Sequence, residues 1–329
     1  MSNFTDPNNL IDPELLGDYA TAQYVESNKL IQSTILETIG VPGITEHSSV
    51  VEMPQWDALG DMQRLAPGDD LNTEGLDDHV ERHPIVRLYK SVLNLDLAGI
   101  IAKGDPNEEA ARQISKNINR GLNKAGVATL QGATAANSGN VVADTGAAPA
   151  VTDFTALEAV YGDILDEILD GRGVWLMRSS IFTAYRDLGL VAAPLPGQEF
   201  QDDITAGRNF TNITGSILGR NVVVDDELYR AGLTSKDSGD ALTYLVGYGA
   251  LKSAIQKDVT VENGRNIEKQ ADQWVWSVHR SMGLRGMDYT ATVAKKGPED
   301  SDLRDSSNYA LVAEDSKFVP TASIQTNYV

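Results

Sequence analysis

The sequence contains no cysteine. This absence excludes disulfide bonds, zinc–thiolate sites and thiol nucleophiles, and it leaves the redox compartment undetermined. Basic residues are also scarce, because 27 Lys and Arg stand against 47 Asp and Glu, which gives a formal net charge of -20. Nucleic-acid affinity comes largely from cations that displace counterions from phosphates. We therefore expect the chain neither to wrap nor to read DNA tightly.

Long hydrophobic runs are missing as well. No window reaches the ~18 apolar residues that a membrane-spanning helix requires, and the first residues lack the basic and apolar regions of a signal peptide. We therefore expect a soluble, unexported chain without a membrane partner. With 329 residues, of which 41% are hydrophobic, the chain is long enough for about two globular lobes plus arms.

Histidine is rare, with four in the chain, and no Gly-x-Ser-x-Gly nucleophile elbow accompanies them. A serine-hydrolase triad therefore has no support. In the segment from His79 to His83, the glutamate Glu81 is central. Zinc proteases need it directly after the first histidine or directly before the second. Because Pro84 would also end any helix there, we interpret this segment as a solvated loop.

Two further segments match ligand-binding patterns only in part. Gly247-Tyr248-Gly249 precedes Lys252 without the glycine-to-lysine spacing of a phosphate-binding loop, so we expect a tightly packed strand that another backbone approaches closely. Asp225 and Asp226 follow a valine run. Adjacent strand residues point to opposite faces, so the two acids indicate a turn rather than a metal site. The sequence thus predicts no catalytic, cofactor-binding or metal-binding residues.

The N-terminal third predicts extended elements. Residues 1–49 include an amphipathic stretch that suits one face of a helix, with apolar positions Val25, Leu30, Ile31, Ile35 and Ile39. So short an element is marginal alone, so we predict an arm that packs on another surface. Residues 50–104 hold strand-like runs on either side of the acidic stretch APGDDLNTEGLDDH, which indicates an extended hairpin with a polar tip.

A long helix is the clearest element that the sequence predicts. Asp105 is a suitable N-cap, Pro106 suits the first helical position, and Gly132 is expected just beyond the end. One buried stripe is expected at spacings of four, four and three residues: Ile114, Ile118, Leu122 and Ala125. The Ala-, Gly- and Asn-rich residues that follow, near 131–151, indicate a flexible connection.

Helices and strands alternate irregularly in the rest of the chain, which indicates an α+β fold. A helix is expected at 154–170, with Thr155 and Glu158 as a capping box. The strand GVWLM, the short helix RSSIFTAYRDLG and paired runs around SILGRNVVVDD follow it. Near the end, Trp274, Trp276 and Val278 share one strand face, and we interpret the polar residues from 295 as a tail.

The order of these pieces, over roughly Tyr19 to Thr292, resembles the major capsid proteins of tailed bacteriophages with the Hong Kong 97 fold. The quoted segments that carry the likeness are EMPQWDALGDMQRL, the strand and helix from IVRLYK to TLQG, GVWLMRSSIFTAYRDLGL with GSILGRNVVVDDEL, and DVTVENGRNIEKQADQWVWSVHRSMGL. The resemblance implies six parts: an N-terminal arm (1–49), an E-loop with its leading strands (50–104), a spine helix and connection in the peripheral domain (105–150), an axial domain (151–257), return strands of the peripheral domain (258–294) and a C-terminal tail (295–329).

The resemblance further implies a structural protein rather than an enzyme. Copies of the chain would form hexamers and pentamers of an icosahedral shell around double-stranded DNA, with only weak non-specific DNA contact. The resemblance also implies a portal as a partner and leaves open whether a cement protein binds. Fewer than fifty residues precede the E-loop, so we expect a separate scaffolding protein, and residues 50–87 contain no lysine for a cross-link. The location implied is the virion, assembled in the host bacterial cytoplasm.

The residues that we expect to take part in assembly come from two segments. Trp56, Met62 and Arg64 lie in the E-loop. The long helix carries a row of like charges every four residues: Arg112, Lys116, Arg120 and Lys124. The row is either a docking strip for an acidic loop of a neighbouring subunit, a contact with packaged DNA, or simply a solvated basic face. Alternatives for the whole chain are a phage decoration or tail protein and an unrecognised hydrolase.

Overall fold

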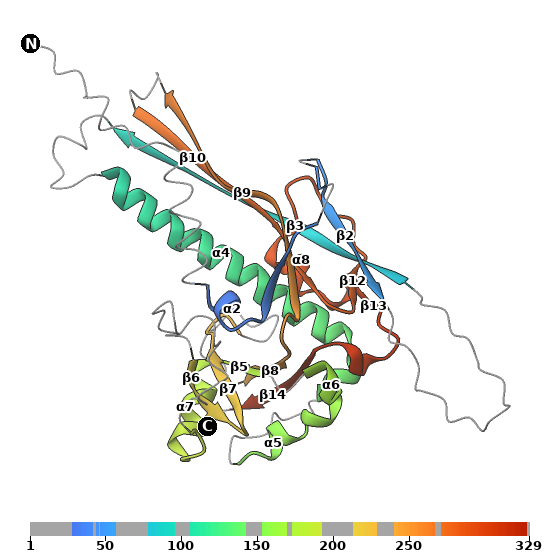
Figure 1. The fold of residues 1–329 in the computed structure, drawn as a ribbon. Helices are drawn as coiled ribbons and strands as arrows, with labels where there is room; N and C mark the ends of the chain where they lie inside the picture. The colour runs from blue at the N-terminus through green and yellow to red at the C-terminus, as the bar shows by residue number, and fades with distance from the viewer. Residues whose placement is uncertain are drawn as a thin grey trace, which may run out of the picture.

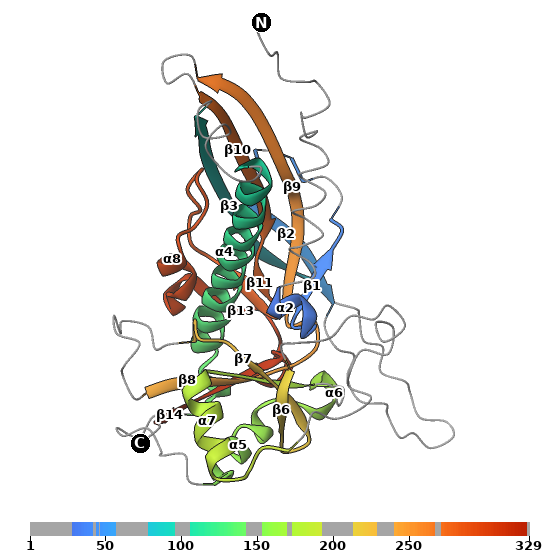
Figure 2. The same cartoon turned by 90° about the vertical axis from the view of Figure 1, so that its left-hand side faces the viewer.

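A computed structural model describes residues 28–41, 44–45, 47–56, 78–95, 106–142, 153–169, 173–192, 213–228, 240–266 and 271–327. The molecule is elongated (Figures 1 and 2). A ribbon of long strands lies beside a single long helix, and a second sheet with short helices lies below them. None of the helices in the described ranges combines the length and apolarity needed to cross a bilayer.

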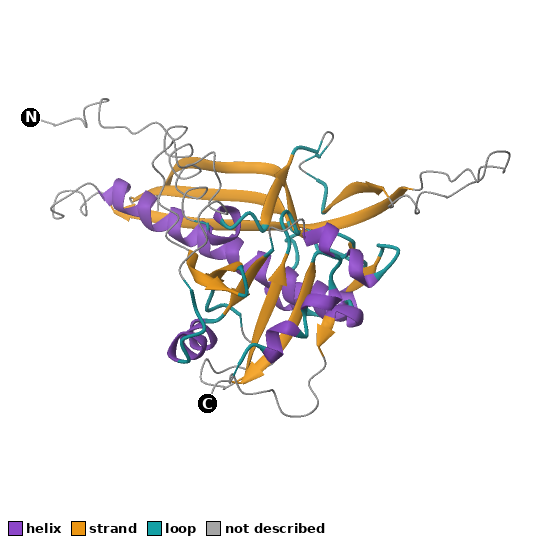
Figure 3. Ribbon diagram, turned by 60° about the horizontal axis from the view of Figure 1, so that its bottom comes forward, coloured by secondary structure: helices purple, strands orange, loops and turns teal. Residues whose placement is uncertain are grey.

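The ribbon is an antiparallel sheet of three long strands, β3 (Asp78–Leu95), β9 (Leu251–Asn266) and β10 (Ala271–Ser281). The full sheet has the order β1-β9-β10-β3-β2, and β11 (Gly283–Leu284) also pairs with β9. The prediction of a shared strand face is confirmed, because Trp274, Trp276 and Val278 are all buried in the main core. Figure 3 shows the helix running along this ribbon.

The long helix, α4, spans Pro106–Ala136. Its predicted stripe is confirmed, since Ile114, Ile118, Leu122 and Ala125 are at most 6% exposed. Its predicted end is wrong, because the helix continues through Gly132. A Cβ at that position would overlap the carbonyl oxygen of Leu303, so the glycine permits a close approach rather than a stop. Asp105 lies outside the described residues.

The predicted hairpin is present at its base. Strand β2 (Val50–Trp56) pairs antiparallel with residues 78–84 of β3, and the rest of β3 pairs with β10. Residues 57–77 at its tip lie outside the described residues. A small separate core lies at the base of the hairpin: Val51, Met53, Ile85 and Ala254.

The second sheet has the order β4-β14-β8-β5-β7-β6. Its strands are β4 (Val141–Val142), β5 (Val174–Met177), β6 (Ile213–Ile217), β7 (Arg220–Val224), β8 (Asp240–Val246) and β14 (Thr321–Asn327). The predicted strand, short helix and paired runs are confirmed here, the helix being α7 (Ser179–Asp187). The chain passes from β8 to β9 through a turn at 247–250, so the expected boundary at 257 falls inside β9.

The same turn contains the glycine-rich segment that was expected to be a strand. Gly247, Tyr248 and Gly249 form the turn rather than a strand, and Gly249 has a φ of +60°. The expected close approach of another backbone is confirmed, because the Gly247 N–H donates to the Pro320 carbonyl at 2.8 Å.

The helix predicted at 154–170 is wrong. The segment forms three short turns instead: α5 (Thr155–Glu158), the 3-10 turn Tyr161–Asp163, and α6 (Asp166–Leu169). Ile164 is extended between them, and the Leu165 N–H donates to the Lys317 carbonyl. The capping box is absent too, since the Thr155 N–H is satisfied by Asp153. Packing of Leu157, Val160 and Ile164 against the second sheet outweighs the local helical pattern.

The predicted C-terminal tail is also wrong. Strand β12 (Met287–Tyr289) pairs with β13 (Tyr309–Leu311), and helix α8 (Asp300–Arg304) lies between them in sequence. Strand β14 is an inner strand between β4 and β8. Three of its buried positions carry small or hydroxyl side chains, Thr321, Ala322 and Ser323, all below 5% exposure, and Ile324 is buried beside them. Such residues carry too weak an apolar pattern to reveal a strand.

The N-terminal arm differs from its prediction in the described part. Helix α2 covers only Lys29–Gln32, and residues 36–39 form strand β1 (Leu36–Ile39), parallel to β9. Thr34 has a φ of +57°, which ends the helix before Ile35. Both Leu30 and Ile35 are fully buried in the main core of this same chain. Val25 lies outside the described residues.

Candidate functional site: the basic face of the long helix

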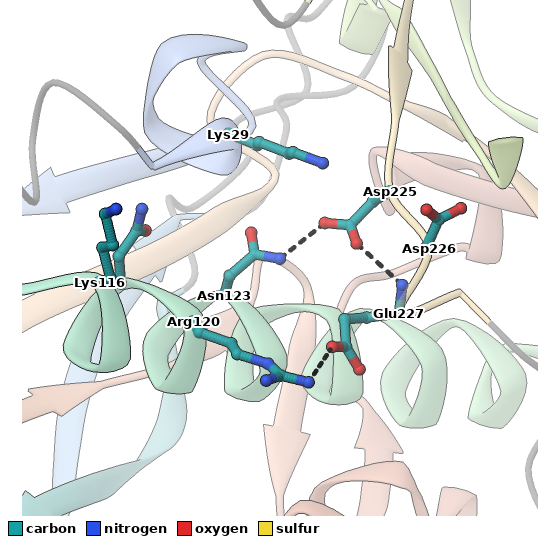
Figure 4. Close-up of a pocket in the computed structure, with 8 residues that line it drawn as sticks. Lys29, Lys116, Arg120, Asn123, Asp225, Asp226 and Glu227 are labelled. Atoms are coloured by element: carbon teal, nitrogen blue, oxygen red, sulfur yellow. Dashed lines mark hydrogen bonds and ion pairs between the residues drawn. The ribbon is translucent and has the colours of Figure 1, made fainter. Parts of the chain in front are cut away.

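The basic row of α4 faces an acidic turn from the second lobe. The turn, Asp225-Asp226-Glu227, directly follows β7, so the predicted turn at the two aspartates is confirmed. Glu227 reaches the row with both carboxylate oxygens. Its Oε1 lies 3.7 Å from Arg120 Nη2 (Figure 4), and its Oε2 lies 3.7 Å from Lys124 Nζ. Arg120 and Lys124 therefore share this one carboxylate as an ion-pair partner.

Asp225 anchors the turn to α4. It is 2% exposed, its Oδ2 accepts from Asn123 Nδ2 at 2.6 Å, and its Oδ1 accepts from the Glu227 N–H at 2.9 Å (Figure 4). A buried carboxylate is stable only when hydrogen bonds replace its hydration. These two contacts supply them, and they hold Glu227 above the helix.

Asp226 connects the same turn to α7. Its Oδ1 accepts from the Ser179 N–H at 3.2 Å, at the first residue of that helix. Burial alone would raise the pKa of Asp226, but the hydrogen bonds from Ser179 and the charges of Lys29 and Arg178 outweigh it. The pKa of Asp226 is therefore lowered, and its carboxylate stays charged at the helix N-terminus.

A pocket of about 330 Å³ opens beside the turn. Its walls come from α2, α4 and the turn, and its lining residues are Lys29, Lys116, Asn119, Arg120, Asn123, Asp225, Asp226 and Glu227. Lys29 Nζ donates to the Val224 carbonyl at 2.9 Å, and Asn28 Nδ2 donates to Asn119 Oδ1 at 2.9 Å. Figure 4 shows Lys116 standing on α4 away from the acidic turn. No described residue forms an ion pair or hydrogen bond with its ammonium group.

The other expected assembly residues are less informative. Arg112 is exposed on α4. Trp56 ends β2, but the placement of its side chain is not described, and Met62 and Arg64 lie outside the described residues. The sequence reasoning missed Glu227. It lies 107 positions from Arg120 in the sequence, and no local pattern indicates that the two would meet.

The interpretation of the histidine segment as a solvated loop is wrong. Glu81 and His83 are fully buried in β3, near Lys252 of β9. Glu81 Oε1 accepts from the Gly286 N–H at 2.6 Å, while its Oε2 lies 3.3 Å from His83 Nε2 and 3.8 Å from Lys252 Nζ. Within the described ranges, no three His, Asp or Glu side chains converge as metal ligands would. The group is a buried polar contact at the base of the hairpin.

Comparisons of sequence and of structure give different results. No family model matches the sequence, and no curated protein matches it. The structure, by contrast, is similar to solved phage head structures, so the chain has the α+β fold of phage capsid subunits.

Three of these structures cover nearly the whole chain. The capsid of Ralstonia phage GP4 aligns with a TM-score of 0.60 at 12% identity, over 91% of this chain and 88% of that one. The head structure of Helicobacter pylori bacteriophage KHP40 aligns with a TM-score of 0.58 at 10% identity, over 99% and 98%. The mature capsid of bacteriophage PhiM1 gives 0.53 at 11% identity, over 90% and 86%.

Proposed function

We propose that this chain is a major capsid subunit, which assembles through hexamers and pentamers into an icosahedral phage shell around double-stranded DNA. The observation that carries the proposal is the extent of the structural match. The alignment with the KHP40 head structure leaves almost nothing of either chain unmatched, so the likeness is one of whole subunits. A structural role, located in the virion, follows from the same proposal.

The shape of the chain supports this function. Helix α4 has 31 residues and is therefore about 47 Å long. In the described part of the hairpin of β2 and β3, the buried cluster at its base consists of Val51, Met53 and Ile85 with Ala254 of β9. Three large apolar side chains on β3 are exposed, Val80 at 49%, Tyr89 at 61% and Leu93 at 40%. Exposed apolar surface on an extended element is typical of protein–protein contact, so neighbouring copies would supply the missing burial.

In this proposal, the hairpin belongs to the E-loop and α4 is the spine helix. A ring of identical subunits uses heterologous contacts, in which one surface of a copy meets a different surface of the next. Such contacts couple the stability of each hairpin to assembly. A separate scaffolding protein, a portal and a cement protein are the further partners that we propose, with only weak DNA contact because of the charge of -20.

Electron microscopy tests the proposal directly. The full chain should be expressed alone and with a candidate scaffolding protein, then examined by negative-stain imaging and sedimentation velocity. We expect closed shells, rings or capsomer-sized oligomers. A monodisperse monomer under all these conditions would contradict the capsid function and favour a decoration or tail protein.

A further inference from the structure

Among the described residues, Glu227 pairs with Arg120 and Lys124 of the basic row on α4, whereas Lys116 of the same row is open. Lys116 lies one turn before Arg120, lines the pocket and is exposed. Its ammonium group has no ion-pair or hydrogen-bond partner among the described residues, whereas Arg120 and Lys124 both face Glu227. The pocket therefore offers an accessible positive charge one helical turn from Arg120, which already pairs with a carboxylate.

Glu227 binds the row weakly. Both of its ion pairs are 3.7 Å long, whereas charge-assisted hydrogen bonds are about 2.7–2.9 Å. The Arg120 side chain is 67% exposed, that of Lys124 is 32% exposed and that of Glu227 is 23% exposed. Ion pairs in such surroundings are screened by water and salt and contribute little. Another carboxylate can therefore compete with Glu227 at small cost.

We propose that this pocket, together with the basic row, binds a carboxylate-bearing segment of a second copy of the chain, and that Glu227 is its internal competitor. The inference rests on the proposed function. With 47 acidic residues against 27 basic ones, carboxylates are the most abundant charged groups on a second copy. The incoming carboxylate binds Lys116 first and then displaces Glu227 from Arg120.

Two substitutions distinguish the competitor role of Glu227 from a purely structural role, because they are expected to change the assembly rate in opposite directions. Lys116→Glu removes the open cation and slows assembly. Glu227→Gln removes the competitor and speeds assembly by about two- to fivefold, the range that corresponds to one exposed ion pair. If Glu227 acted only as a structural contact between the lobes, its loss would lower the melting temperature and slow assembly instead.

The matched control is Glu262→Gln on β9, which removes the same kind of exposed ion pair, to Lys257 at 3.4 Å, without involving the basic row or the acidic turn. All variants and the wild type are followed by light scattering and sedimentation velocity at low and high salt, after nuclease treatment. We expect Glu262→Gln to match the wild type, and high salt to reduce the difference between Glu227→Gln and the wild type.

The outcomes distinguish this inference from the proposed function. If the wild type forms shells and Glu227→Gln assembles at the wild-type rate or more slowly, the competitor role is overturned while the capsid function stands. If the wild type never assembles, the capsid function fails first. If the gain in Glu227→Gln appears only when short duplex DNA is added, the row binds DNA and the proposed carboxylate partner is wrong.

Discussion

The N-terminal half of α4, which carries the basic row, and its C-terminal half differ in what surrounds them. Every residue from 125 to 134 is buried, whereas only Ile114, Ser115 and Ile118 are buried between 112 and 121. The buried half consists mainly of small residues, and it contacts α8 and β13 at Gly132 and β14 at Thr134. The other half buries one stripe and exposes the basic row. One helix thus combines a half that the fold surrounds with a half that buries one stripe and exposes its basic face.

Truncation of a buried side chain in each half tests this comparison with the largest expected effects. Leu130 is fully buried in the surrounded half, and Ile118 is 6% exposed in the other. Replacing either with Ala should cost about 2–5 kcal/mol, with Leu130→Ala near the upper end because packed atoms on all sides cannot collapse into the cavity. Urea unfolding measures both, with exposed Asn117→Ala as the control. A larger loss at Ile118 would contradict the comparison.

Glycine substitutions sharpen the same contrast. A Cβ at Gly132 would overlap the Leu303 carbonyl oxygen, which belongs to the backbone and cannot rotate away. We expect Gly132→Ala to destabilise the chain by about 1–3 kcal/mol, as overpacking does.

The matched control is Gly121→Ala in the exposed half. Its Cβ would lie 2.8 Å from Leu88 Cδ1, the end of a side chain that can change rotamer. Alanine also gains about 1 kcal/mol of helix propensity over glycine. We therefore expect the thermal unfolding midpoint of Gly121→Ala to be equal to, or higher than, that of the wild type. Equal losses at both glycines would show that the two halves are packed alike.

The sequence predicted the helix and its buried stripe because both depend on a local period. Ile114, Ile118 and Leu122 repeat at helical spacing whatever they pack against. The role of Gly132 was predicted wrongly because a glycine is needed there to make room for the carbonyl oxygen of Leu303, which is remote in the sequence. The helix prediction for residues 154–170 failed for the same reason, because the Leu165 N–H donates a hydrogen bond to the carbonyl of Lys317, which is remote in the sequence, rather than to a carbonyl within a helix.

The basic row of the candidate site was predictable, but its internal partner was not. The spacing of Lys116, Arg120 and Lys124 is visible in the sequence, and the turn at Asp225 follows from strand geometry. Whether the basic row and the acidic turn come into contact depends on how the second lobe packs against α4. Strand β14 was missed for a different reason, because its buried Thr321 and Ser323 are polar and Ala322 is small, which leaves Ile324 as the one large apolar residue from 321 to 327.

Charge reversal in the exposed half should separate assembly from stability. We expect the double variant Lys116→Glu and Arg120→Glu to change the free energy of unfolding by less than about 1 kcal/mol, because both side chains are exposed. Shell yield should fall clearly, as measured by sedimentation velocity. A double reversal of exposed Arg186 and Lys296 makes the same charge change elsewhere. Unchanged shell yield in the α4 variant would remove the docking-strip hypothesis.

The smallest expected effect concerns the acidic turn that faces the exposed half. Because the folded-state pKa of Asp226 is lowered, its charge contributes stability above the unfolded value of about 3.9. That contribution is lost as the pH falls through the lower, folded value.

Asp226→Asn should therefore be less stable than the wild type at neutral pH, by under about 1 kcal/mol because the carboxylate is largely exposed. The difference should shrink as the pH falls below about 3.9, as measured by urea unfolding at several pH values. A difference that stayed constant with pH would mean that the carboxylate's charge does not hold the turn against α7 and that only its hydrogen bonds matter.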